Sequence, residues 1–170
     1  NQPFFSVFNT MMTHESRVWK NADLPLLVDP EAIAVPPYYP DNEVVRKDMA
    51  IHYSNIIRID SIVGKILNDL EADGLADNTI VVFTSDNGGV SSGDGFATAC
   101  LPMRGGKGRQ WEGGIRQPYY IAWPGTTDAG TTTETLATGM DFYPTILDIA
   151  GLPLRPDQHL DGVSLVPALK

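Results

Sequence analysis

The sequence has little cysteine, little basic charge and no long apolar run. Its one cysteine, Cys100, cannot form a disulfide within the chain and leaves the redox compartment undecided. The sequence contains 12 Lys and Arg residues and 21 Asp and Glu residues. The resulting net charge of -9 argues against nucleic acid or an anionic membrane as a partner. No apolar run approaches the ~20 residues of a membrane-spanning helix. The first residues also lack the basic stretch that opens a signal peptide.

The rest of the composition is typical of one globular domain. The chain has 170 residues, of which 42% are hydrophobic and 19% charged. It has no initiator Met, and residues 3–8 already have the pattern of a core strand. We therefore expect a fragment of a longer protein.

The central stretch is an apolar run followed by polar residues and glycines. Residues 80–83 form a continuous run that is typical of a strand buried on both faces in a parallel sheet. Asp86 and Asn87 follow, where ligand sites of open α/β sheets tend to lie. Their oxygens suit a hard cation, Ca²⁺ or alternatively Mg²⁺. By itself, however, Asp-Asn-Gly is more often a simple turn.

The start of the chain is predicted to be a strand over residues 4–12 that opens into a polar turn containing His14. A histidine in such a turn is usually a hydrogen-bonded surface group, but its imidazole can donate a proton near neutral pH. Residues 21–40 contain five prolines and are predicted to be irregular.

A long helix is predicted from a cap at Asp41 or Asn42 to Gly74. Asp60 lies at a position of the helix that belongs to its otherwise apolar stripe. We therefore expect its carboxylate to be partly buried and to have a polar partner. His52 on the same helix is expected to have a packing role. The helix, a short loop and the apolar run make an α/β unit, so the fold class is predicted to be α/β.

Two more elements are predicted towards the end of the chain. Residues 119–123 have the pattern of a strand, closed by a Pro-Gly turn. Asp141 is expected to cap a helix that runs through Ile149 and stops at Gly151.

A segment rich in glycine and basic residues lies between residues 88 and 116. It suits a tetrahedral oxyanion such as phosphate or sulfate, because glycine lets the backbone approach a ligand and lysine is a mobile positive charge. A nucleotide-binding P-loop is excluded, since Gly108 follows Lys107 where that motif requires Ser or Thr. The segment contains Gly88, Gly89, Gly93, Gly95, Gly105, Gly106, Gly108, Gly113, Gly114, Arg104, Lys107, Arg109 and Arg116.

Several ordered segments resemble the formylglycine-dependent sulfatases of the alkaline phosphatase superfamily. They are T-I-V-V-F-T-S-D-N-G-G from Thr79, L-P-M-R-G-G-K-G from Leu101, W-E-G-G-I-R-Q-P from Trp111, I-A-W-P-G from Ile121, M-D-F-Y-P-T-I-L-D-I-A-G from Met140 and D-G-V-S-L from Asp161. The resemblance implies a mixed, largely parallel sheet flanked by helices. It identifies residues 1–170 as a partial, incomplete sulfatase catalytic domain without the N-terminal part that holds the nucleophile.

The resemblance also implies a function and a site. The reaction is hydrolysis of an aryl or carbohydrate sulfate, a small-molecule or glycan ester, to an alcohol and inorganic sulfate. Asp86 and Asn87 match the family's calcium ligands, Lys107 matches the lysine that holds a sulfate oxygen, and His14 matches the histidine that protonates the departing alcohol. Such roles agree with the chemistry of these side chains. A periplasmic, secreted or lysosomal location is the family's pattern.

The nucleophile of the family is a formylglycine made from the cysteine of a C-x-P-x-R motif. Residues 100–104 spell this motif, but Gly105 and Gly106 follow and oppose the helix that the motif normally opens. We therefore expect the formylglycine in an upstream region and not at Cys100. The isolated chain is then expected to bind calcium weakly and to turn over no substrate.

Two alternatives stay open at this stage. A phosphodiesterase or phosphonate hydrolase of the same superfamily would often have histidine at the position of Asn87, because it binds transition metals through nitrogen. A relative that binds sulfated glycans without catalysis would keep the fold and lack the nucleophile.

Overall fold

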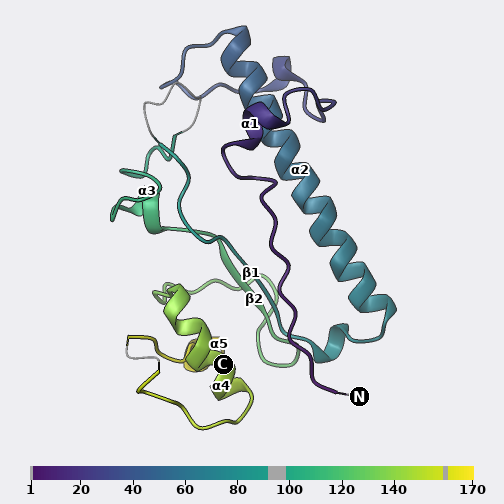
Figure 1. Cartoon of the computed structure of the whole chain (residues 1–170), viewed down its shortest axis with the longest axis vertical. Helices are drawn as coiled ribbons and strands as arrows, with labels where there is room; N and C mark the ends of the chain where they lie inside the picture. Colours follow the sequence, from purple (N-terminus) through teal and green to yellow (C-terminus); the bar gives the residue numbers. More distant parts are fainter. Residues whose placement is uncertain (1, 92–98, 159–160) are drawn as a thin grey trace. The chain divides into compact units, whose positions relative to one another are not determined.

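The structure is a computed structural model that describes residues 2–91, 99–158 and 161–170 (Figure 1). The chain forms two units, one of Asn1–Ala76 with Asn87–Arg116 and one of Asp77–Asp86 with Gln117–Lys170. The helices of the first unit are α1 (Arg17–Lys20), η1 (Pro30–Ala32), α2 (Glu43–Ala72) and α3 (Glu112–Ile115). The short helix η2 (Ala76–Asn78) crosses the boundary. The second unit holds β1 (Val81–Thr84), β2 (Tyr119–Ala122), η3 (Gly139–Asp141), α4 (Phe142–Ile149) and α5 (Val166–Leu169).

Helix α2 has the ends that the sequence predicts. The side-chain oxygen of Asn42 accepts a hydrogen bond from the backbone N–H of Val45 at 3.0 Å, which caps the first turn. Gly74 follows the last turn with φ of 68°, a backbone conformation that glycine adopts without a steric penalty.

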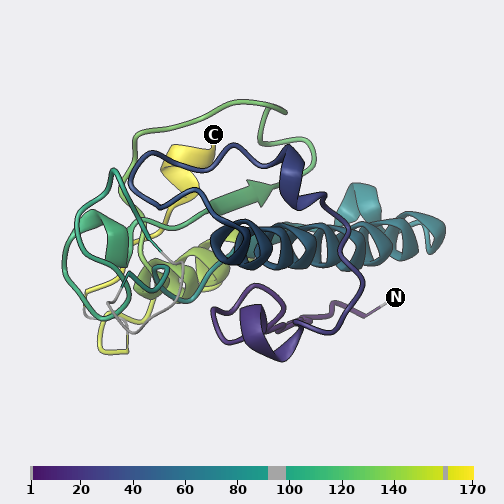
Figure 2. The same ribbon diagram turned by 90° about the horizontal axis from the view of Figure 1, so that it is seen from above.

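The first half of α2 carries the core of the first unit. Val45, Met49 and Ala50 are buried against Ile33 of the preceding loop. Val28, Val35 and Tyr39 pack on the same cluster. Helix α1 also packs on α2, so the turn that leads into α1 is fixed to this core (Figure 2).

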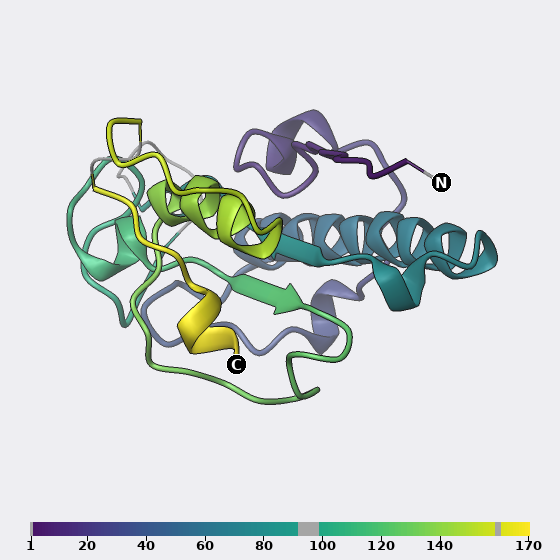
Figure 3. The ribbon, with the colours of Figure 1, turned by 90° about the horizontal axis from the view of Figure 1, so that it is seen from below.

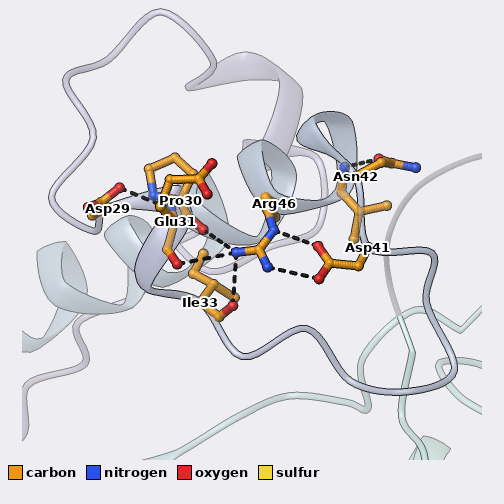
Figure 4. Close-up of polar contacts among 8 residues, drawn as sticks. Asp29, Pro30, Glu31, Ile33, Asp41, Asn42 and Arg46 are labelled. Atoms are coloured by element: carbon orange, nitrogen blue, oxygen red, sulfur yellow. Dashed lines mark hydrogen bonds and ion pairs between the residues drawn. The ribbon is translucent and has the colours of Figure 1, made fainter.

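Arg46 attaches the proline-containing loop to α2 (Figure 4). Its guanidinium donates to the backbone carbonyls of Pro30 and Ile33, at 3.1 and 3.2 Å, and to that of Glu31. It also forms a two-pronged ion pair with the carboxylate of Asp41. The predicted irregular segment is therefore held by side chain to backbone bonds, since it has few backbone bonds of its own.

The second half of α2 differs from the prediction. Leu67 is 42% exposed, and Asp60 is exposed instead of partly buried. Among the described elements, α1 and η1 pack on α2, and the buried residues of α2 end at Ile59. His52 is half-buried, its ring contacts that of Tyr53, and burial lowers the pKa of its imidazole, in agreement with a packing role.

Residues 4–12 were predicted as a strand and are not one. The segment is extended and runs alongside α2 in the opposite direction (Figures 1 and 2). Its large apolar side chains are exposed, with Phe5 at 66% and Val7 at 74%. A strand needs a paired neighbour, and within residues 2–91, 99–158 and 161–170 the sheet consists of β1 and β2.

The second unit contains the strand pair β1–β2 (Figure 3). The two strands are antiparallel, with Val81 opposite Ala122 and Thr84 opposite Tyr119. Both strands were predicted, but β1 is not buried on both faces, because Phe83 is 42% exposed. Phe83 instead contacts the ring of its cross-strand partner, Tyr120, at a centroid distance of 6.1 Å.

Helix α4 occupies the predicted residues, and Gly151 ends it with φ of 65°. Asp141 stands at the helix start, but its carboxylate does not cap α4. It accepts from the N–H of Thr138 at 2.7 Å and from that of Val163 at 2.8 Å. The buried carboxylate thus joins the segment before α4 to the segment that leads into α5.

Candidate active site

A polar cluster in the first unit brings His14 and Lys107 together. The Nζ atom of Lys107 lies 3.3 Å from Nε2 of His14. Glu15 is beside both, with Oε1 3.3 Å from Nε2 of His14 and 3.7 Å from Nζ of Lys107. The three side chains are between 25% and 35% exposed, so a ligand can reach them from solvent.

The contacts of His14 fix which ring nitrogen carries its proton. The backbone N–H of Ser16 donates to Nδ1 at 3.2 Å, and the Ser16 hydroxyl lies 3.0 Å from the same atom. A backbone N–H can only donate, so we assign Nδ1 as the acceptor and the ring proton to Nε2. The nitrogen that faces Lys107 and Glu15 is therefore the donor.

A turn positions His14 at the start of α1. The N–H of His14 donates to the carbonyl of Met11 at 3.1 Å, and the N–H of Arg17 donates to the carbonyl of His14 at 2.8 Å. Val18, one turn further on, is buried. The imidazole thus projects from a hydrogen-bonded turn whose following helix packs on α2.

The loop of Lys107 is held by its glycines. The N–H of Lys107 donates to the carbonyl of Gly89 at 2.7 Å, and the N–H of Gly88 donates to that of Gly114 at 3.0 Å. A Cβ atom on Gly88 would lie 2.3 Å from the oxygen of Gly113. We predicted that the glycines would let the backbone approach a ligand. Here they let the backbone around Gly88 and Gly89 approach the backbone of residues 107–114.

Two of the predicted loop glycines, Gly93 and Gly95, lie outside the described residues. The others include Gly105 and Gly108, both with positive φ. The guanidinium of Arg104 stacks on Trp111, 3.7 Å above the centre of its ring.

Asp86 and Asn87 follow β1 in a bend, as predicted. Asp86 is exposed and is the last residue of its segment of the second unit, while Asn87 is half-buried and begins a segment of the first. In the part of the chain that the structure describes, no group of three or more His, Cys, Asp or Glu could hold a metal ion. The pair supplies two oxygen side chains of the six to eight ligands that Ca²⁺ takes, so it fits part of a calcium site. The convergence of Asp86 and Lys107 on one ligand stays a prediction.

Cys100 is a packed thiol in a loop. It is 8% exposed, and its Sγ donates to the carbonyl of Gly89 at 3.1 Å. Burial raises the pKa of the thiol and so opposes the reactive thiolate. No helix opens here; the next described helix, α3, begins at Glu112. The environment agrees with the interpretation that the C-x-P-x-R spelling is a coincidence.

Glu15 and Ser16 were not among the predicted site residues. Both neighbour His14 in the chain, and their polar side chains in a tight turn were the available signal. Their role depends on which nitrogen each one meets, which the sequence pattern does not specify.

Comparison with known proteins places these features in one family. The sequence model of the Sulfatase family matches residues 1–152. The chain is 30% identical over 205 aligned positions to the ulvan-active sulfatase of Formosa agariphila, covering 100% of this chain and 32% of that protein. It is 39% identical over 113 positions to human steryl-sulfatase, covering 64% of this chain and 19% of that protein. The chain therefore spans about a third or less of the length of these relatives.

Solved structures give the same result. The crystal structure of Ps i-CgsB in complex with k-i-k-neocarrahexaose matches with a TM-score of 0.60 and 32% identity, covering 86% of this chain and 31% of that one. A protein solved with its substrate D-glucosamine-2-N,6-O-disulfate matches with a TM-score of 0.61 and 32% identity, covering 74% and 23%. The predicted sulfatase-like α/β fold class is confirmed. The predicted sheet was largely parallel, whereas the strands of the described residues form one antiparallel pair.

Proposed function

Because this chain belongs to the sulfatase family, we propose that the whole protein hydrolyses a sulfate ester to an alcohol and inorganic sulfate. The observation that carries the proposal is the 3.3 Å approach of the Lys107 ammonium to the imidazole of His14. An ammonium and an N–H donor at one accessible place suit the negative oxygens of a sulfuryl group. Residues 1–170 are then part of the catalytic domain.

The two side chains have different proposed roles. Lys107 binds an oxygen of the sulfuryl group and stabilises the charge that grows there during the reaction. His14 donates a hydrogen bond from its Nε2–H to the ester oxygen and so stabilises the charge that grows on the departing alcohol. Ser16 keeps the ring in the required tautomer by donating to Nδ1.

Asp86 and Asn87 are the residues that would hold a calcium ion. Calcium would supply positive charge to the sulfuryl oxygens as a Lewis acid. An amide oxygen at residue 87 suits a hard cation better than a transition metal, which supports a sulfatase over a phosphodiesterase or phosphonate hydrolase. The formylglycine nucleophile is proposed to come from outside this chain, since Cys100 is buried and hydrogen-bonded.

A carbohydrate sulfate is the proposed substrate class. Ulvan appears in the name of one relative, and two similar structures contain a neocarrahexaose and a glucosamine disulfate. These are properties of those proteins, and they support a glycan or small-molecule sulfate ester for this one.

The test compares esters in the whole protein. We expect 4-nitrophenyl sulfate to be hydrolysed faster than 4-nitrophenyl phosphate, and His14→Ala to lower the rate on a sugar sulfate by about 10²-fold or more. Preferred cleavage of the phosphate would favour the phosphodiesterase alternative. Binding of sulfated glycans without turnover would favour a non-catalytic relative.

A further inference from the structure

We propose that Glu15 is a positioning residue of the site, which holds the Nε2–H of His14 and the ammonium of Lys107 in place with one carboxylate oxygen. The proposal rests on the proposed function for its catalytic consequence. The arrangement itself follows from the contacts of His14, Ser16 and Lys107.

Nε2 of His14 and Nζ of Lys107 are both hydrogen-bond donors, and they lie close together. Ser16 donates to Nδ1, which places the ring proton on Nε2. Lys107 carries only donors, yet its Nζ is 3.3 Å from the same Nε2. Two donors so close need an acceptor between them. Glu15 Oε1 is that acceptor, at 3.3 Å from Nε2 and 3.7 Å from Nζ.

The second step is the rigidity of Glu15. The N–H of Val18 donates to the carbonyl of Glu15 at 3.1 Å, and Ser16 beside it is buried. The side chain therefore starts from a backbone fixed at the beginning of α1. Lys107 reaches the cluster from a loop whose backbone is bonded to Gly89, so Glu15 is the charged contact between the two segments.

The third step is the consequence for catalysis. Without the carboxylate, the ammonium and the Nε2–H repel each other, and both side chains turn towards water. The Nε2–H, which passes from Glu15 to the ester oxygen when the substrate binds, is then misplaced. A misplaced donor slows substrates with poor leaving groups most, because these depend most on a hydrogen bond to the departing oxygen.

The experiment has a direct arm that needs no activity. Nitrogen-15 spectra of the histidine rings are recorded in the whole protein, in Glu15→Ala and in Glu15→Gln. We expect His14 to carry its proton on Nε2 and to show an N–H signal protected from exchange with water. That signal broadens in Glu15→Ala and is partly retained in Glu15→Gln, whose amide oxygen still accepts. A proton on Nδ1 in the unaltered protein, or an N–H signal insensitive to both changes, overturns the proposal.

The second arm measures rates with leaving groups of different acidity. Glu15→Ala is expected to lose roughly 10-fold in kcat on an alkyl or sugar sulfate, a part of the 10²–10⁴-fold that a positioned donor contributes. The loss on 4-nitrophenyl sulfate should be smaller, because this ester depends on the Lys107 contact and little on His14. In the His14→Ala background, Glu15→Ala should cause only this smaller loss on both esters. Equal losses on both esters while His14 is present overturn the positioning role.

Controls separate this result from instability and from the proposed function. Glu112→Ala removes a carboxylate that pairs with Arg116 on the surface, and it should change neither the spectrum nor the rates. Thermal unfolding of each variant reports on folding. If the unaltered protein hydrolyses no sulfate ester, the proposed function fails, and the spectra still decide the arrangement of Glu15, His14 and Lys107.

Discussion

The ammonium of Lys107 lies 3.3 Å from the imidazole of His14, although the two residues are 93 positions apart in the chain. One side chain comes from the turn before α1 and the other from a loop between β1 and β2. This pair is the basis of the predictions on activity.

Replacement of Lys107 is expected to abolish most of the activity. Lys107→Ala removes the charge that we assign to a sulfuryl oxygen, so kcat/KM on 4-nitrophenyl sulfate should fall by about 10²–10³-fold, as for loss of other preorganised charge-stabilising donors. Lys107→Arg should restore little, because a planar guanidinium does not replace a compact ammonium.

Lys65→Ala is the matched control. Lys65 is 74% exposed on α2 and pairs only with Asp69 among the ion pairs of the described residues. An exposed pair of this type contributes about 0.3–0.5 kcal/mol, so activity and stability should stay near those of the unaltered protein. Similar activities for both lysine variants would remove Lys107 from the site.

Calcium removal is the second prediction. Dialysis of the whole protein against a chelator should abolish turnover, and added Ca²⁺ should restore it. Asp86→Ala should shift the calcium dependence of the rate to higher concentration, because a neutral side chain replaces one of the charged oxygen ligands. The isolated 170-residue chain should bind Ca²⁺ weakly in calorimetry and turn over nothing. Full activity of Asp86→Ala without added calcium would contradict the metal assignment.

Cys100→Ala tests the nucleophile. The thiol is buried and donates to the Gly89 carbonyl, so its loss should cost about 1 kcal/mol of stability and leave kcat nearly unchanged. Alkylation of the intact protein at neutral pH should also be slow, because burial raises the pKa of Cys100 and keeps the thiol protonated. A robust sulfatase rate from the isolated chain that Cys100→Ala abolishes would make this cysteine the nucleophile after all.

Sequence patterns predicted the elements whose signals are local. The cap at Asp41 or Asn42, the stop at Gly74 and the strand of residues 119–123 depend on neighbouring residues. The structure confirms them, with Asn42 as the cap and the strand at Tyr119–Ala122. Burial was predicted less well, since it depends on what packs on a face. Asp60, which is exposed, and residues 4–12, which form no strand of the described sheet, show this.

The same distinction holds for the site. His14 and Lys107 were identified from the family's motifs, and the structure brings them together. Glu15 could not be assigned from the pattern, because its role follows from the proton position that Ser16 imposes on His14. The predicted role of Gly88 as a ligand contact was not found, since the space beside it is filled by the backbone of Gly113. A run of glycines does not reveal whether a ligand or another backbone segment occupies that space.

Gly88→Ala follows from that last point. Gly88 is buried, and a Cβ atom there would lie 2.3 Å from the carbonyl oxygen of Gly113, so the backbone must move. We expect a loss of about 1–3 kcal/mol in the free energy of unfolding, as for other overpacked sites. Activity should fall as well, because the Gly89 carbonyl that holds the Lys107 N–H is one residue away.

Gly64→Ala is the control. No atom lies within 4 Å of the added Cβ, and alanine in a helix interior should raise the free energy of unfolding by up to about 1 kcal/mol. The measurements are urea unfolding and kcat/KM of both variants. If the Gly88→Ala protein is as stable and as active as the Gly64→Ala protein, the close contact of Gly88 with Gly113 does not hold the loop of Lys107.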